Sequence, residues 1–244
     1  MTIRVLVNGA LGRMGSEVVQ VLKDNPQFNL VGTCGKGDDL SKAIQQSQAD
    51  VVVDFTNANV VFENSQKILA AGARPVIGTT GLMLPQIKQL QAMAEKQKIG
   101  GIIAPNFSLG GVLMMKYATQ WIKYFPNVEI IELHHDGKLE APSGTAMRTA
   151  QTLSALRGQH AESKSERVLV EGARGATVEG IHVHSIRLPG LVAHQEIIFG
   201  GVDETLTVRH DSIHRRCFMP GVLLACEKVM SLNELVYGLE HIIE

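Results

Sequence analysis

The distribution of apolar residues divides the chain into two parts. In the first part, short β-branched runs predict strands at residues 3–7, 28–34, 51–55 and 76–77. Stretches with apolar side chains at helical spacing, such as residues 16–25, separate these runs. Near-continuous apolar strands that alternate with helices are typical of a parallel sheet covered on both faces, so we predict an α/β architecture here.

The second part has a different pattern. Its predicted elements are an amphipathic helix at 109–125 and strands at 128–135, 181–187, 194–201 and 204–210. Gly200 and Gly201 suit a tight hairpin between the last two strands. These four strands predict a mixed or antiparallel sheet, and therefore a second domain of the α+β class.

Two further segments complete the predicted organisation. Residues 158–178 combine Gly, Ser, Lys, Glu and Arg with little apolar periodicity, which predicts a long flexible loop. Residues 220–230 are strongly helical. Ser231 and Glu234 fit a capping box, which predicts a final helix after them.

A glycine-rich turn follows the first predicted strand. It reads Asn8-Gly9-Ala10-Leu11-Gly12-Arg13-Met14-Gly15, with the spacing GxxGxxG and not the commoner GxGxxG. Such a turn lets a pyrophosphate lie on a helix N-terminus, as in Rossmann-type dinucleotide-binding domains. A glycine-rich turn without a nucleotide is the alternative interpretation.

Small and polar residues also follow the later strands of the first part. They are Thr56-Asn57, Gly78-Thr79-Thr80-Gly81 and Ala104-Pro105-Asn106-Phe107-Ser108. Ligands bind at the carboxyl ends of strands in open α/β sheets. An ordinary turn is the preferred interpretation for Thr56-Asn57, and a plain core aromatic is the alternative for Phe107.

The most informative segment is residues 128–146, where an apolar strand runs into His134 and His135. Because strand side chains alternate between faces, we expect these two histidines to point in opposite directions. Lys138 and an adjacent histidine are candidates to supply protons to a bound anion. A strand–loop–helix junction with two surface histidines is the alternative.

The anion itself is expected at the residues that follow. Pro142 suits the start of a helix, whose first backbone N–H groups then lie free at its positive end. Ser143 and Thr145 add hydroxyl donors, and Gly144 lets a ligand approach the backbone. This combination predicts a pocket for a carboxylate or a phosphate.

Composition excludes several classes of protein. The 244 residues are 45% apolar with a formal net charge of −1, which argues against a nucleic-acid partner held by phosphate contacts. The three cysteines, Cys34, Cys217 and Cys226, form no CxxC pair, so we predict no disulfide framework and no metal site. There is no signal-peptide core and no apolar run near the roughly 20 residues of a membrane span, so we expect no membrane partner and a cytoplasmic location.

Residues 134–146 read HHDGKLEAPSGTA. This segment resembles HHxxKxDAPSGTA, the signature of the 4-hydroxy-tetrahydrodipicolinate reductase family, with Glu140 where the family usually has Asp. GTTG at 78–81, APNFS at 104–108 and SIRLPG at 185–190 are also similar to family segments. Gln195 is a departure, because the family usually has Glu there, and Arg215 matches a family arginine or is an ordinary surface residue.

The resemblance implies an oxidoreductase that reduces 4-hydroxy-tetrahydrodipicolinate to tetrahydrodipicolinate with NADPH or NADH, in the diaminopimelate route of lysine biosynthesis. It implies His134 and Lys138 as the catalytic proton donors, and a dicarboxylate substrate held by His135, Ser143, Gly144 and Thr145. The cofactor set comprises Gly9, Ala10, Leu11, Gly12, Arg13, Met14, Gly78, Thr79, Thr80, Ala104, Pro105, Asn106 and Phe107. In members of this family, the C-terminal segment of the chain returns to the first domain. The expected domains are therefore 1–106 with 216–244 for the dinucleotide, and 107–215 for substrate binding and assembly into a homotetramer.

Cofactor choice rests on the end of the second strand, where many family members have an acidic residue. Here the strand ends Thr33-Cys34-Gly35-Lys36-Gly37-Asp38-Asp39, without a carboxylate directly at its end. Lys36 is a candidate partner of the 2′-phosphate of NADPH, or a solvated turn lysine, and Asp38 is a candidate for the ribose of NADH. We predict dual use, with NADPH at least as good as NADH.

Two other functions stay open at this level. One is a different NAD(P)-dependent enzyme on the same framework, such as an amino-acid or aldehyde dehydrogenase. Only Cys217 lies near a histidine-bearing loop, which argues against a thiol-acylating aldehyde dehydrogenase. The other is a dinucleotide-binding redox sensor with a partner such as DNA. The absence of a basic stripe in the sequence argues against this second function.

Overall fold

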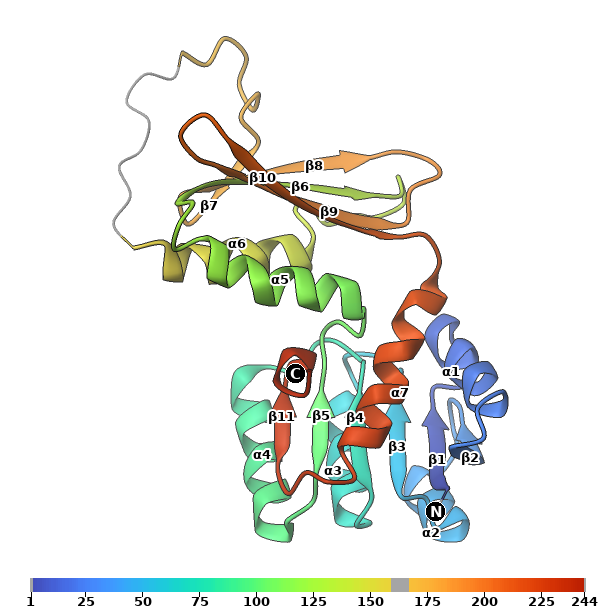
Figure 1. Ribbon diagram of the computed structural model, residues 1–244. Coiled ribbons are helices and arrows are strands. Elements are labelled where there is room, and N and C mark those ends of the chain that lie inside the picture. Colours follow the sequence, from blue (N-terminus) through green and yellow to red (C-terminus); the bar gives the residue numbers. More distant parts are fainter. Residues whose placement is uncertain (1, 159–166, 244) are drawn as a thin grey trace. The chain divides into compact units, whose positions relative to one another are not determined.

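The computed structural model describes residues 2–158 and 167–243, which form two compact units (Figure 1). One unit contains the chain up to Leu109 and from Arg215 onward, and the other is Gly110–His214. The first unit is therefore built from two separate segments of the sequence. The functions expected of the two parts, dinucleotide binding and substrate binding, remain predictions.

The first unit is a parallel sheet with the strand order β11-β5-β4-β3-β1-β2. Its strands are β1 (Ile3–Asn8), β2 (Phe28–Cys34), β3 (Val51–Asp54), β4 (Arg74–Ile77), β5 (Gly101–Ile103) and β11 (Leu235–Tyr237). Its helices are α1 (Arg13–Lys23), α2 (Leu40–Ser47), α3 (Val61–Ala70), α4 (Leu84–Gln97) and α7 (Met219–Lys228), with short 3-10 turns η1 (Arg215–Phe218) and η2 (Leu239–His241). The strand order reverses beside β1, the place where ligands bind in sheets of this kind.

The strands of this sheet are apolar on both faces because helices cover both sides of it. Val51, Val52 and Val53 have no exposed surface although their side chains alternate between the two faces. Helices α2, α3 and α4 contribute to one continuous core with Leu6 and Val52. The predicted α/β class and parallel sheet are confirmed.

The prediction of a final helix after Ser231 was wrong. Residues 235–237 instead form β11, which pairs in parallel with β5, and only the short turn η2 follows. The capping-box pattern is a local signal, whereas β11 gains a partner strand through contacts that no local pattern contains. β5, three residues long, was also too short to identify as a strand from its pattern.

The second unit is a mixed sheet with the strand order β10-β9-β6-β8-β7. Its strands are β6 (Asn127–His134), β7 (Ala176–Val178), β8 (Ile181–Arg187), β9 (Ala193–Gly200) and β10 (Thr205–Ser212). β6 and β8 are parallel, and the other neighbours are antiparallel. The predicted mixed sheet is confirmed, with five strands where four were expected, because β7 lies inside the segment predicted as a loop.

Helices α5 (Leu109–Trp121) and α6 (Gly144–Arg157) lie together on one side of this sheet (Figure 1). The core between them contains Val128 and Ile130 of β6 with Ile197 and Phe199 of β9. Side chains alternate along β6, so Glu132 points to the same helix-covered side as Ile130. Residues 159–166, part of the predicted loop, lie outside the described residues.

Candidate active site

A buried carboxylate stands near the carboxyl end of β6. Glu132 has no exposed side-chain surface, and its Oε2 lies 2.5 Å from Nδ1 of His134. Arg187, at the end of the parallel strand β8, donates from Nη2 to Oε1 at 2.7 Å and from Nη1 to Oε2 at 3.0 Å. The register of the two strands sets this arrangement, because it places His134 beside Arg187.

Glu132 is ionised despite its burial. Burial alone raises the pKa of Glu132, but hydrogen bonds with His134, Arg187 and Ser185 together outweigh that effect and bring the pKa from 4.5 to about 2. A buried carboxylate is stable only when its lone pairs are matched by donors of this kind. His134 therefore lies against a full negative charge.

The same carboxylate reaches the start of α6. Ser143 donates its backbone N–H to Oε1 of Glu132 at 3.2 Å, and its side chain accepts from the N–H of Ala146 at 3.2 Å. Ser143, 3% exposed, is thus the N-cap of the helix. Pro142 was expected to start the helix, but it precedes this cap.

The anion pocket predicted at this helix start has the required form. Gly144 and Thr145 occupy the first turn, where backbone N–H groups have no partner within the helix. A Cβ added to Gly144 would meet no atom within 4 Å, so the space beside its backbone is open. No acidic side chain lies in this first turn, where it would compete with a bound anion for the N–H donors.

The loop between β6 and α6 is held by β8. Arg187 donates to the carbonyl of Glu140 at 2.7 Å, and Leu188 donates its N–H to the carbonyl of His134 at 3.1 Å. Lys138 lies on this loop, with Nζ 3.2 Å from Oε2 of the exposed Glu140. His135 lies after the end of β6, so the alternation expected of two strand residues applies to His134 alone.

In the first unit, the glycine-rich turn leaves no room for side chains. Gly9 has φ +82°, and a Cβ there would lie 2.4 Å from the carbonyl oxygen of Phe55. A Cβ on Gly15 would lie 2.1 Å from the carbonyl oxygen of Gly9. The turn is closed further by N–H groups of Gly9 and Ala10, which donate to the carbonyl of Cys34 at 2.9 and 3.1 Å. Gly12 then caps α1, so the predicted combination of glycine turn and helix start is present.

A second buried carboxylate, Asp54, joins the loops beside this turn. Its Oδ1 accepts from the hydroxyls of Thr56 and Thr79 at 2.7 and 2.6 Å. Its Oδ2 accepts from the side-chain amides of Asn8 and Asn64 at 2.8 and 3.0 Å. Asp54 is fully buried and connects the ends of β1, β3 and β4. Thr56, for which an ordinary turn was preferred, belongs to this network.

Phe107 lies in the interior of the first unit. It is 3% exposed, and its ring centroid lies 5.8 Å from that of Phe55. This packing accounts for the aromatic side chain, and a cofactor contact of Phe107 remains a prediction.

The end of β2 contains the groups relevant to cofactor choice. Asp38 turns back and accepts the N–H of Gly35 through Oδ2 at 2.8 Å. Asp39 is occupied as the N-cap of α2, where it accepts from Lys42. Lys36 is exposed at the tip of this turn. A carboxylate and an ammonium group therefore both lie at the carboxyl end of β2.

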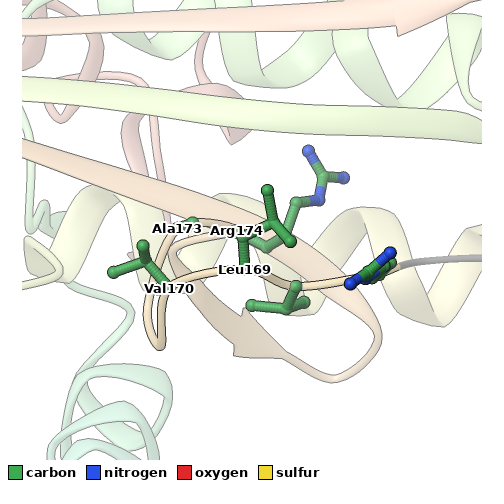
Figure 2. A pocket seen from close by; sticks show the side chains of 6 residues that line it. Leu169, Val170, Ala173 and Arg174 are labelled. Carbon is green, nitrogen blue, oxygen red and sulfur yellow. The ribbon is translucent and has the colours of Figure 1, made fainter.

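In the second unit, a cavity of about 340 Å³ lies in the loop before β7 (Figure 2). It is lined by Arg167, Val168, Leu169, Val170, Ala173 and Arg174. None of the residues predicted to bind substrate or cofactor is among them. In residues 2–158 and 167–243 no cluster of His, Cys, Asp and Glu is arranged to hold a metal ion, and none of the described helices could span a membrane.

Acid should remove the stabilisation that Glu132 provides. The pKa of Glu132 is depressed in the folded chain, so its contribution is complete above pH 4.5 and is lost as the pH falls toward about 2. We predict that Glu132→Gln is less stable than wild type at neutral pH and that this difference narrows below pH 4.5. The free energy of unfolding of both proteins is measured by denaturant titration at a series of pH values. Glu171→Gln, which alters an exposed glutamate, should track wild type, and a difference for Glu132→Gln that is constant with pH would contradict the prediction.

Substitution of Asp54 should loosen the predicted dinucleotide site. In Asp54→Asn an NH₂ group faces donors that now point at a carboxylate oxygen, so at least one loop must move. We predict an NADPH dissociation constant raised by about 10-fold, equivalent to roughly 1.4 kcal/mol, in a fluorescence titration. Asp50→Asn is the matched control, because Asp50 pairs with Arg4 just before the start of β3. Equal NADPH affinity in Asp54→Asn and wild type would refute the role of Asp54.

Comparisons with known proteins agree over the whole chain. The family models of dihydrodipicolinate reductase match residues 3–107 with the N-terminal part and residues 110–243 with the C-terminal part. The chain is 51% identical to the 4-hydroxy-tetrahydrodipicolinate reductases of Legionella pneumophila (strain Philadelphia 1) and Coxiella burnetii (strain RSA 493), and each match covers 100% of both chains.

Solved structures give the same result. A dipicolinate-bound dihydrodipicolinate reductase from Paenisporosarcina sp. TG-14 is 43% identical and superimposes with a TM-score of 0.93, covering 100% of each chain. An amine dehydrogenase from Mycobacterium smegmatis, 14% identical over 97% of this chain and 95% of its own, has a TM-score of 0.67 and shows a shared fold alone. The chain belongs to the dihydrodipicolinate reductase family.

Proposed function

We propose that this protein reduces 4-hydroxy-tetrahydrodipicolinate to tetrahydrodipicolinate with NADPH or NADH, in the diaminopimelate route of lysine biosynthesis. The observation that carries the proposal is one hydrogen-bonded group in the second unit. In this group, Glu132 is hydrogen-bonded both to His134, the proposed proton donor, and to Ser143, the N-cap of the helix at which we place the anion. Full-length identity of 51% to reductases with this activity supports the same conclusion.

The substrate is a dicarboxylate, and the start of α6 fits one of its carboxylates. Backbone N–H groups of Gly144 and Thr145, with the Thr145 hydroxyl, offer donors at the positive end of the helix. His135 and Ser143 complete the proposed substrate set. The related structure with dipicolinate, itself a planar dicarboxylate, is consistent with such a ligand.

The dinucleotide fits the first unit. The turn from Gly9 to Met14 is tight, since a Cβ at Gly9 would collide with the backbone of Phe55, and it leads directly into the N-terminus of α1. We assign the pyrophosphate to this turn and to α1, and the nicotinamide side to the loops after β4 and β5. The proposed loop residues are Gly78, Thr79, Thr80, Ala104, Pro105, Asn106 and Phe107. When bound, the reduced dinucleotide supplies the hydride.

The protein then supplies placement and protons. Hydride addition at a ring carbon leaves an electron pair on the substrate that must be protonated, and a positioned acid lowers that barrier. His134, beside the Glu132 carboxylate, is the proposed first donor. Lys138, on the loop that Arg187 holds, is the second.

The direct test is oxidation of NADPH in the presence of the product of the preceding condensation step. We expect substrate-dependent turnover and competitive inhibition by pyridine-2,6-dicarboxylate. Turnover with amino acids or aldehydes, and none with the condensation product, would show instead a different dehydrogenase on the same fold.

We also propose a homotetramer that covers the open side of the second sheet. Ile131 and Leu133 of β6, Ile186 of β8 and Ile198 of β9 alternate with core residues and are only partly buried on the side opposite α5 and α6. Ionisable side chains lie next to them on this face, since Ile131 is paired with His184 of β8 and Glu196 of β9, so the face combines apolar and charged groups as many interfaces do. The four side chains come from three neighbouring strands of the sheet.

Removal of either proposed proton donor should lower turnover. We predict that His134→Gln and Lys138→Ala each reduce kcat roughly 10²- to 10⁴-fold while NADPH affinity is retained, because both residues lie outside the first unit. Steady-state kinetics and a cofactor titration measure the two effects. Lys123→Ala is the control, because Lys123 is an exposed lysine between α5 and the start of β6 in the same unit. Near-wild-type turnover in His134→Gln would exclude His134 from the mechanism.

Cofactor preference should depend on the turn after β2. We predict dual use, with NADPH at least as good as NADH, because the Lys36 ammonium can pair with the 2′-phosphate. Lys36→Ala should lower kcat/KM for NADPH by about 10-fold more than for NADH. Asp38→Asn is the complementary variant, since its carboxylate suits ribose hydroxyls, and it should affect NADH more. If Lys36→Ala affects both cofactors equally or neither, Lys36 has no role in selection.

A charge on the open side of the sheet should prevent assembly. We predict that wild type is a tetramer by light scattering and that Ile131→Glu shifts it to smaller species, because a carboxylate would be buried without a partner. Val202→Glu changes an exposed residue in the turn between β9 and β10 and should leave the mass unchanged. A monomeric wild type at micromolar concentration would contradict the proposal.

A further inference from the structure

The hydrogen bonds of Glu132 define which nitrogen of His134 carries a proton. Both carboxylate oxygens accept from Arg187, and Oε1 also accepts the backbone N–H of Ser143. These groups can only donate, so the carboxylate acts as an acceptor for every neighbour. At 2.5 Å from Oε2, Nδ1 of His134 must therefore carry a hydrogen.

Nε2 is then the nitrogen of His134 that exchanges protons. It makes no hydrogen bond within the part of the chain that the structure describes, whereas Nδ1 is occupied. The ring is also constrained from its backbone, because the carbonyl of His134 accepts the N–H of Leu188 at 3.1 Å.

We propose that Glu132 is a positioning residue for the reduction: it fixes the ring of His134 through Nδ1 and so directs proton transfer to Nε2. This inference rests on the proposed function, in which His134 is the proton donor. The side chain of Glu132 has no exposed surface, so we do not place it among the residues that contact substrate.

The proton balance of the step is simple. The Nε2–H bond of the imidazolium breaks and its electron pair stays on Nε2, while the proton bonds to the substrate atom that holds the pair left by hydride addition. Nδ1 keeps its hydrogen throughout, and Glu132 remains ionised. Neutral His134 then takes a new proton at Nε2 from solvent.

Glu132→Gln separates this role from a structural one. The Ser143 N–H can only donate, so the amide oxygen takes the place of Oε1 and keeps the bonds from Ser143 and from Nη2 of Arg187, whereas the bond from Nη1 to Oε2 is lost. The amide NH₂ then faces Nδ1, which must accept, so the hydrogen of neutral His134 moves to Nε2. We expect kcat to fall roughly 10- to 100-fold, with the inhibition constant of pyridine-2,6-dicarboxylate within about threefold of wild type.

The decisive experiment is a double-mutant cycle in kcat with Glu132→Gln, His134→Gln and the double variant. If Glu132 acts through His134, the double variant is no slower than His134→Gln alone. Multiplied losses in the double variant would overturn the inference while wild-type turnover left the proposed function intact. A wild type without turnover would overturn both.

Two further variants protect the test. Glu132→Asp keeps the charge but shortens the side chain, and it should lose less kcat than Glu132→Gln. It takes the place of Glu132→Gln in the cycle if the latter fails to fold. Glu171→Gln is the control, because Glu171 is an exposed glutamate in the loop before β7. Equal losses in Glu171→Gln and Glu132→Gln would also overturn the inference.

Discussion

The second unit depends on the stabilisation of one ionised carboxylate in its interior. An unpaired charge at the position of Glu132 would be severely destabilising, yet this side chain has no exposed surface. Its stability requires donors from three places: the end of β6, the end of β8 and the N-cap of α6. Because one carboxylate satisfies all three, it fixes the relative positions of His134, Arg187 and Ser143. Glu132 therefore holds the proposed proton donor and the proposed carboxylate pocket in a fixed position relative to each other.

The first unit uses the same principle with different chemistry. Asp54 is also fully buried, but its hydrogen-bond partners among the described residues are hydroxyl, amide and backbone N–H groups, without a cation. These donors come from the end of β1, from the loops after β3 and β4, and from helix α3. Each unit thus has a buried carboxylate at the carboxyl end of its strands, and each carboxylate holds loops in place.

The sequence predicted the fold class well because apolar periodicity reflects burial directly. The runs at β1, β2 and β3 and the strands β6, β8, β9 and β10 were all identified from this pattern. The failures occurred where long-range pairing decides the structure. β11 is three residues long and is stabilised by β5, and β7 is an equally short edge strand in a polar segment. Local capping chemistry also misled at Pro142, since Ser143 is the actual cap.

Glu132 was missed for a related reason. Its position relative to Val128 and Ile130 already places it on the buried face of a strand, and a charged residue there is a signal of a hydrogen-bonded network. Its partner Arg187 lies 55 positions away, however, so no local motif connects them. Asp54 at the end of an all-valine strand gives a similar signal, and its partners Asn8 and Thr79 lie 46 and 25 positions away in sequence. Burial of a charge can be inferred from alternation, whereas the identity of its donors requires the fold.

The most direct measurement is the location of the hydrogen on His134, by nitrogen NMR of protein labelled at its histidines. The spectrum is recorded with pyridine-2,6-dicarboxylate bound, and the signal is assigned by its loss in His134→Gln. If Glu132 organises the site, neutral His134 carries its hydrogen on Nδ1 in wild type and on Nε2 in Glu132→Gln. A wild-type ring with its hydrogen on Nε2, or a ring that exchanges freely between both forms, would contradict a site built on the Glu132 carboxylate.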